Sequence, residues 1–253
     1  MLRTRVIPVL LLMDGGLVKG QEFKKHRYVG DPINAVRIFN EKQVDELMFL
    51  DISATIENRE PDFDLLTDIA SETFMPFGYG GGIKNIATIE RLFSLGVEKV
   101  VINTEAFYTP NLISEAAIVA GSQSVVVSID VRKTLFGGYE VYVKNGTVRT
   151  RIDPVTYAKK MQELGAGEIV LCSIDREGTG RGYDLELINR VTDSVNIPVV
   201  CLGGAGSVHD LAEAKRSSNV SGLAAGNLFV FHGRHKAVLI TYPDYIELEK
   251  ILN

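Results

Sequence analysis

Met75-Pro76-Phe77-Gly78-Tyr79-Gly80-Gly81-Gly82-Ile83 has a counterpart in Ile197-Pro198-Val199-Val200-Cys201-Leu202-Gly203-Gly204-Ala205-Gly206. In both stretches a proline precedes a short apolar run that ends in glycines, and the two stretches lie 122 residues apart. Other landmarks recur at the same spacing, namely Asp31-Pro32 with Asp153-Pro154, Glu46 with Glu168, and Ile52 with Ile174. A constant spacing across so many landmarks predicts two copies of one structural unit.

Strand-like and helix-like segments alternate along the whole chain. The apolar runs of strand length are Val6–Leu12, Glu46–Ile52, Met75–Gly78, Lys99–Ile102, Ser124–Ile129, Glu168–Ile174, Ile197–Leu202 and Gly222–Ala225. Runs with helical periodicity lie between or after them, at Ile33–Glu41, Phe63–Glu72, Ile86–Leu95, Leu112–Ala120, Pro154–Leu164, Leu185–Val195, Val208–Ser217 and Pro243–Leu252. Eight βα units in 253 residues predict a closed (β/α)₈ TIM barrel rather than an open sheet. No linker divides the chain, so we expect one domain over residues 1–253, with half-barrels of about 1–122 and 123–253.

Composition excludes several classes of protein. The net charge of -5 gives no reason to expect a nucleic-acid or membrane partner. No stretch is long enough to span a bilayer, and the apolar run near the N-terminus is too short and too broken by Pro8 for a signal peptide. A cytoplasmic location is therefore the default. Cys172 and Cys201 lie in apolar strands, which favours buried thiols over a disulfide or a metal pair, and we expect no metal or cofactor.

The glycine runs predict phosphate-binding loops, because barrels of this class place their active sites at the C-terminal ends of the strands. Glycines let backbone N–H groups approach an anion closely. A single glycine run is more often a tight turn, but here two occur at the repeat spacing. Each half would pair its glycine loop with the end of the next strand, and two such sites suit a ligand with a phosphate at each end. The predicted phosphate-binding residues are Gly81, Gly82, Asn103 and Thr104 in the first half, and Gly203, Gly204, Ala225 and Gly226 in the second.

Four charged residues stand at the starts of predicted strands and so lie at the opposite, N-terminal rim of the barrel. They are Arg5, Glu46, Lys99 and Glu168. Their alternating signs predict a ring of salt bridges that closes the bottom of the barrel. Stability alone would account for such a ring.

Taken together, these motifs resemble those of the cyclase subunit of imidazole glycerol phosphate synthase over essentially the whole chain. The matching stretches include Arg5-Val6-Ile7-Pro8, Val18-Lys19-Gly20, Gly30-Asp31-Pro32, Phe49-Leu50-Asp51-Ile52, Ile102-Asn103-Thr104, Ile129-Asp130, Ser173-Ile174-Asp175-Arg176 and both glycine loops. The resemblance implies that a glutaminase subunit docks on the N-terminal face and releases ammonia into the barrel. There the ammonia would attack a bisphosphorylated ribonucleotide at the C-terminal face. It also implies that Arg5, Glu46, Lys99 and Glu168 form an ammonia gate, and that Glu98 forms a salt bridge with the glutaminase.

The catalytic pair of the family is incomplete in this sequence. The cyclase reaction needs two carboxylates as acid and base, at the ends of the first and fifth strands. Asp130 supplies the second, whereas Leu11 stands where the family has the first. Loss of a catalytic acid or base costs about 10²–10⁴-fold in rate. The mouth also carries Leu202 for a serine, Cys172 for a threonine and Glu177 for an aspartate.

The sequence most resembles a branch of paralogues encoded with bacterial surface-polysaccharide genes. The matching residues include His235-Lys236-Ala237-Val238-Leu239-Ile240. This resemblance implies a barrel that passes ammonia from a glutaminase to a third enzyme, an amidotransferase that forms an acetamidino group on a nucleotide-linked sugar of O-antigen biosynthesis. Two alternatives stay open. One is an active cyclase of histidine biosynthesis that uses Asp130 with a substitute acid such as Asp51 or Asp175, and the other is a non-catalytic barrel that binds a phosphorylated ligand.

Overall fold

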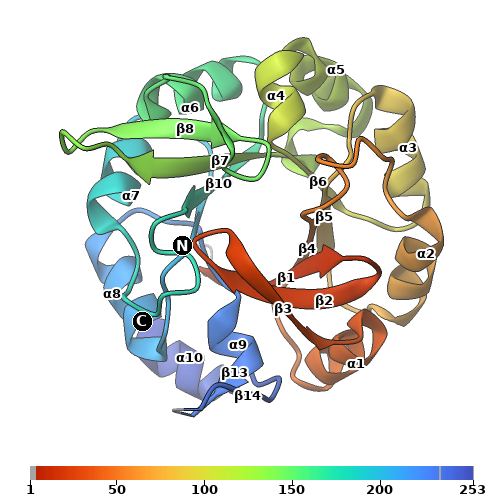
Figure 1. The fold of residues 1–253 in the computed structure, drawn as a ribbon, viewed down its shortest axis with the longest axis vertical. Coiled ribbons are helices and arrows are strands. Elements are labelled where there is room, and N and C mark those ends of the chain that lie inside the picture. Colours follow the sequence, from red (N-terminus) through yellow and green to blue (C-terminus); the bar gives the residue numbers. More distant parts are fainter. Residues whose placement is uncertain (1–3, 234, 253) are drawn as a thin grey trace.

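Eight parallel strands close into a barrel in the computed structural model, which describes residues 4–233 and 235–252 (Figure 1). In order around the barrel they are β1 (Arg5–Met13), β4 (Leu47–Asp51), β5 (Phe77–Gly80), β6 (Lys99–Ile102), β7 (Val125–Lys133), β10 (Glu168–Ser173), β11 (Val199–Leu202) and β12 (Gly222–Ala225). Closure comes from β1, which pairs in parallel with both β12 and β4. The predicted TIM barrel is confirmed, with all eight predicted strands in place.

Helices form a ring outside the strands (Figure 1). They are α1 (Pro32–Glu41), α2 (Phe63–Glu72), α3 (Ile86–Ser94), α5 (Asn111–Ala120), α6 (Pro154–Glu163), α7 (Leu185–Thr192), α8 (Val208–Ser217) and α10 (Tyr245–Leu252), with the shorter α4 (Thr104–Tyr108) and α9 (Asn227–Val230). The repeated Asp-Pro pair begins two of them. Asp31 accepts a hydrogen bond from the backbone N–H of Asn34 at 2.9 Å, and Asp153 caps α6 in the same manner. The following proline occupies the first helical position, where its fixed φ is favourable.

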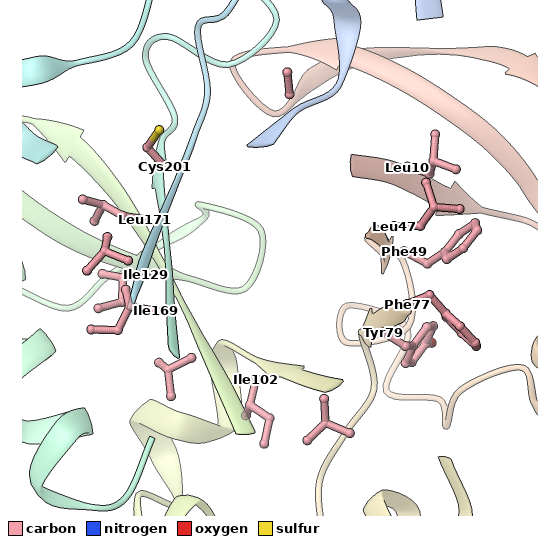
Figure 2. Close-up of a cluster of buried hydrophobic side chains, with 14 of the residues drawn as sticks. Leu10, Leu47, Phe49, Phe77, Tyr79, Ile102, Ile129, Ile169, Leu171 and Cys201 are labelled. Carbon is pink, nitrogen blue, oxygen red and sulfur yellow. The ribbon is translucent and has the colours of Figure 1, made fainter. Parts of the chain in front are cut away.

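The hydrophobic core has two layers, one on each side of the strands. The outer layer packs between strands and helices, and Figure 2 shows part of it. There the rings of Phe49 and Phe77 meet edge to face, with centroids 6.1 Å apart and an interplanar angle of 88°. The inner layer fills the barrel with Ile7, Val9, Met48, Val101, Val126, Val170, Cys172, Val200, Leu202 and Ala224.

Two hairpins extend the barrel at the C-terminal end of its strands, and the sequence analysis did not predict either. One consists of β2 (Gly16–Gln21) and β3 (Lys24–Gly30), which continue from β1. The other consists of β8 (Tyr139–Val143) and β9 (Val148–Arg149), which continue from β7. Strand β3 is largely exposed and rich in charge, so it lacks the apolar alternation that identifies a strand. Shorter elements are η1 (Ser122–Ser124), β13 (Phe231–His232) and β14 (Ala237–Val238).

Both cysteines are buried free thiols, Cys172 on β10 and Cys201 on β11, as predicted. Across residues 4–233 and 235–252, no helix has the length and apolar character needed to cross a membrane.

Replacing Phe49 by alanine should destabilise the fold, because this side chain is fully buried in the outer layer. We expect a loss of about 3–5 kcal/mol in the free energy of unfolding, measured by urea denaturation. The matched control is Phe74→Ala, since Phe74 is 87% exposed. Its effect should stay within about 0.5 kcal/mol, and equal losses in the two variants would contradict the assignment of Phe49 to the core.

Candidate functional site

An open cavity lies at the C-terminal ends of the barrel strands. Its volume is about 1030 Å³, including the solvent space at its mouth. We refer to it as the mouth cavity. Its walls combine apolar side chains from several strands with a few polar ones. The lining includes Val9, Leu11, Phe23, His26, Leu50, Asp51, Gly80, Gly81, Gly82, Lys84, Val101, Asn103, Thr104, Ser128, Asp130, Asn145, Cys172, Glu177 and Leu202.

Asp130, the candidate proton-transfer group from the sequence, is a buried acid that lines this cavity. Its side chain is only 8% exposed. The hydroxyl of Ser128 donates to Oδ1 at 3.3 Å, and the amide of Asn103 donates to Oδ2 at 3.3 Å. Burial raises the pKa of Asp130 to about 7, with a further increase from Glu177 and an opposing effect from the Ser128 hydrogen bond. At neutral pH this carboxyl can therefore either accept or donate a proton.

Leu11 stands on the opposite wall of the mouth cavity. Strands β1 and β7 lie four places apart in a closed barrel of eight, so the two side chains approach the cavity from opposite sides. Leu11 is in register with Leu50 and packs with Phe23 against the inner apolar layer. Asp130 thus faces a hydrocarbon wall at the place where a second carboxylate is expected from the family resemblance.

Two further titratable residues adjoin this site, and sequence reasoning gave them no role. Glu177, in the loop after β10, lines the mouth cavity, and burial raises its pKa while Lys19 opposes that shift. Lys19, on β2, is 2% exposed and donates from Nζ to the carbonyl oxygen of Val9. Burial lowers the pKa of Lys19 to about 8, against the influence of Glu177. One sequence signal could have identified Lys19. It is a lone lysine that follows apolar residues in the short strand, in Leu17-Val18-Lys19.

The two acids considered as substitutes for the missing aspartate are both engaged elsewhere. Asp51 lines the mouth cavity, but it accepts backbone N–H groups of Ser53 and Ala54 and pairs with Arg59 at 2.9 Å. Asp175 lies outside the cavity lining and accepts the backbone N–H of Lys133 at 2.8 Å. Both carboxyl groups are thus already engaged by donors of the protein itself.

The four charged residues at the other end of the barrel form one connected set, which we call the charged ring. Arg5 donates to both Glu46 and Glu168. Lys99 Nζ lies 2.9 Å from Glu46 Oε1 and 2.8 Å from Glu168 Oε2. Both glutamates are almost fully buried, and burial would lower the pKa of Arg5, but its two acidic partners raise it above the ordinary value. Two cations and two anions balance, so the ring closes the barrel without a net formal charge.

The structure brings only part of the predicted phosphate-binding set to the mouth cavity. Gly81, Gly82, Asn103 and Thr104 line it, whereas Gly203, Gly204, Ala225 and Gly226 do not. Glu98 is exposed at the N-terminal face beside Lys99, and its backbone N–H donates to Phe77 O at 3.0 Å. Its side chain is thus accessible to a partner on that face.

The fold and the site together define a class of protein, a (β/α)₈ barrel with buried acids at its mouth and a charged ring at its base. Residues 5–236 match the family model described as histidine biosynthesis protein, and the chain belongs to that family.

Named relatives extend over almost the whole chain. A protein of Pseudomonas aeruginosa, provisionally named an imidazole glycerol phosphate synthase subunit, is 53% identical over 98% of this chain and 99% of its own length. A Leptospira interrogans protein with the same provisional name is 49% identical over 99% of both chains. The imidazole glycerol phosphate synthase subunit HisF of Streptococcus mutans is 41% identical over 90% of this chain and 91% of its own.

The raised pKa of Asp130 predicts a pH-dependent effect of Asp130→Asn on stability. The folded protein binds this proton up to about pH 7, whereas an unfolded aspartate releases it near 4, so the unmodified chain loses stability as the pH rises between these values. Relative to the unmodified chain, the variant should gain on the order of 3 kcal/mol in unfolding free energy between pH 4 and 8.

Urea denaturation across this pH range provides the measurement, with Asp68→Asn on the exposed face of α2 as the control. A pH-independent difference between Asp130→Asn and the unmodified chain would show that Asp130 ionises as an ordinary surface carboxyl.

Proposed function

We propose that this chain is the barrel subunit of a glutamine amidotransferase complex and works as an ammonia conduit whose own cyclase step is lost. A glutaminase subunit docks on the N-terminal face, ammonia crosses the charged ring and the apolar barrel interior, and it leaves at the mouth cavity. Family membership and relatives named as imidazole glycerol phosphate synthase subunits support the complex. The observation that carries the loss of the cyclase step is Leu11, which faces Asp130 where the reaction needs a second carboxylate.

The interior of the barrel supports the conduit. Between the charged ring and Asp130 the inner layer consists of aliphatic side chains, with Cys172 near the top. An ammonium ion would lose its hydration there at a cost of several kcal/mol or more, whereas neutral ammonia carries no net charge. Passage requires a transient opening of the charged ring, and docking of the glutaminase beside Glu98 would supply it. In this proposal Arg5, Glu46, Lys99 and Glu168 are the gate.

The destination of the ammonia in this proposal is a third enzyme, an amidotransferase of surface-polysaccharide biosynthesis in the cytoplasm that forms an acetamidino sugar. Such an enzyme would have to dock over the C-terminal face. The tip of the hairpin after β7 offers a contact there, because Leu135 is 100% exposed and Phe136 is 99% exposed. Large apolar side chains in full contact with water are typical of protein interaction sites.

The alternative function is an active cyclase of histidine biosynthesis. One observation favours it, because Glu177 also lines the mouth cavity with a raised pKa. Asp130 and Glu177 would then be the two proton-transfer groups, in place of Asp130 with Asp51 or Asp175.

A cyclase assay on the purified chain, with the bisphosphorylated ribonucleotide and excess ammonium, decides between these functions. We expect turnover at least about 10²-fold below that of a histidine-pathway cyclase assayed in parallel. Leu11→Asp should restore part of the activity, because it returns a carboxylate to the wall facing Asp130. Full turnover by the unmodified chain, abolished by Glu177→Gln, would establish the alternative and refute the lost cyclase step.

The conduit is tested by Lys99→Ala in the complex with the glutaminase. Removing this cation leaves two buried glutamates with one partner, so the ring should lose its regulated closure. We expect glutamine hydrolysis to continue while the yield of ammonia delivered to the acceptor per glutamine falls, because the ring no longer closes behind the ammonia. Lys159→Ala, on an exposed position of α6, is the control. Unchanged coupling in a folded Lys99→Ala complex would count against the conduit.

A further inference from the structure

Basic side chains gather on two segments that follow the C-terminal ends of β1 and β12, although the whole chain has a net charge of -5. Neither residues 23–30 nor residues 227–242 contain an aspartate or a glutamate. We call the exposed basic residues of these segments the basic rim, and they are Lys24, Lys25, Arg27, His232, His235 and Lys236. A local excess of positive charge on an acidic chain attracts partners of the opposite sign.

Contacts of Arg27 join the two segments into one surface. Arg27 lies on β3, and its Nη2 donates to Lys236 O at 2.7 Å, although the two residues are 209 positions apart in the chain. The guanidinium carbon also lies 4.3 Å from the centre of the Phe231 ring, as a cation–π contact. Phe231 belongs to β13, which pairs with β14 directly after the turn that contains Lys236. The hairpins β2–β3 and β13–β14 therefore present their charges together.

The lysines of the basic rim have their charges available to a partner. Within residues 4–233 and 235–252, Lys24, Lys25 and Lys236 form no ion pair, whereas the exposed Arg149 is paired with Glu140. Val238 and Leu239 follow Lys236 and are 47% and 52% exposed. The surface thus offers free cations with apolar side chains beside them, a combination found at protein interfaces.

The basic rim adjoins the mouth cavity. Phe23 and His26 line the cavity, and they lie next to Lys24, Lys25 and Arg27 in the β2–β3 hairpin. A protein seated on the rim would therefore stand beside the opening of the cavity.

The exposed Leu135 and Phe136 lie on the other side of this opening. Their hairpin continues from β7 and the β2–β3 hairpin continues from β1, two strands that are four places apart in the barrel (Figure 1). A partner that contacted both hairpins would span the mouth. Ammonia that leaves an uncovered mouth is lost to solvent, so a conduit needs such a cover.

We propose that the basic rim is the docking surface for a protein partner with an acidic surface, which covers the mouth cavity. The inference rests on the proposed function, because the partner that this place fits is the ammonia acceptor. Charges at the edge of an interface speed association and fix orientation, while the apolar side chains on both sides of the mouth slow dissociation. An anionic lipid surface also attracts cations. Lipid would not retain neutral ammonia, however, so the position beside the mouth favours a protein.

Fluorescence anisotropy with a labelled poly-L-glutamate peptide as the acidic probe tests the basic rim on the purified full chain. We expect the peptide to bind and to lose affinity when the salt concentration is raised about tenfold. Lys24→Glu combined with Lys236→Glu should weaken binding by about tenfold, the order expected from reversing two exposed charges. The matched control reverses two exposed lysines of α6, Lys159→Glu with Lys160→Glu, and should bind as the unmodified chain does. Lys24→Gln with Lys236→Gln replaces the first variant if that variant does not fold.

A second measurement uses the complex with the glutaminase and the acceptor enzyme. The peptide should lower the ammonia delivered per glutamine without slowing glutamine hydrolysis, and the rim variant should do the same without peptide. Equal peptide binding by the rim variant and the control would overturn the docking surface. Binding to phosphatidylglycerol vesicles that depends on the rim, with delivery unchanged in the rim variant, would assign the rim to a membrane instead. An unmodified complex that delivers no ammonia would refute the proposed conduit, whereas loss of delivery in the rim variant alone would support both.

Discussion

Closure of the sheet between β1 and β12 is the constraint on which the other features depend. The parallel pairing of Arg5 with Gly222 through Pro8 with Ala225 leaves no edge strand among the eight. Because each of these strands pairs in parallel with its neighbours in the barrel, all eight point the same way around one axis. All eight strands therefore end at one face, which collects the loops that carry chemistry, and all begin at the other. The same closure brings Arg5 beside Glu46 and Glu168, which are far apart in the sequence. The charged ring is thus a consequence of barrel geometry as well as a support for it.

The barrel separates two polar ends by an apolar interior. The two acids of the charged ring have almost no contact with solvent, since Glu46 and Glu168 are 2% and 4% exposed. Buried ion pairs of this kind add little to stability compared with apolar packing. Their presence at the base of a barrel with an apolar interior is consistent with the proposed gate. At the other end, the hairpins limit access, with Phe23 approaching Gly146 and Asn145 donating to Ile52 O.

The sequence was sufficient for the barrel because the signals involved are local and repeated. Apolar runs of strand length located the eight strands, and the Asp-Pro pairs located two helix starts through capping geometry. The charged ring was predictable because a charged residue at the start of a parallel barrel strand must lie at the N-terminal face of the barrel. The hairpins were not predictable, because β3 is exposed and its pairing depends on β2. The burial of Lys19 follows from that missed hairpin, because Lys19 lies on β2, which pairs with β1.

The two half-barrels thus share the features that shape the backbone, whereas their side chains at the mouth differ. Glycines and Asp-Pro caps must be kept in both halves, because strand ends and helix starts fail without them. The groups at the mouth contribute nothing to closure, and a buried acid even costs stability, as the raised pKa of Asp130 indicates. A second carboxylate facing Asp130 would raise that cost through like-charge repulsion. Leu11 avoids this repulsion and adds apolar contact with the inner layer of the core. In the proposed conduit without a cyclase step, stability alone favours leucine at this position, and the charged ring is unaffected because it lies at the other end of the barrel.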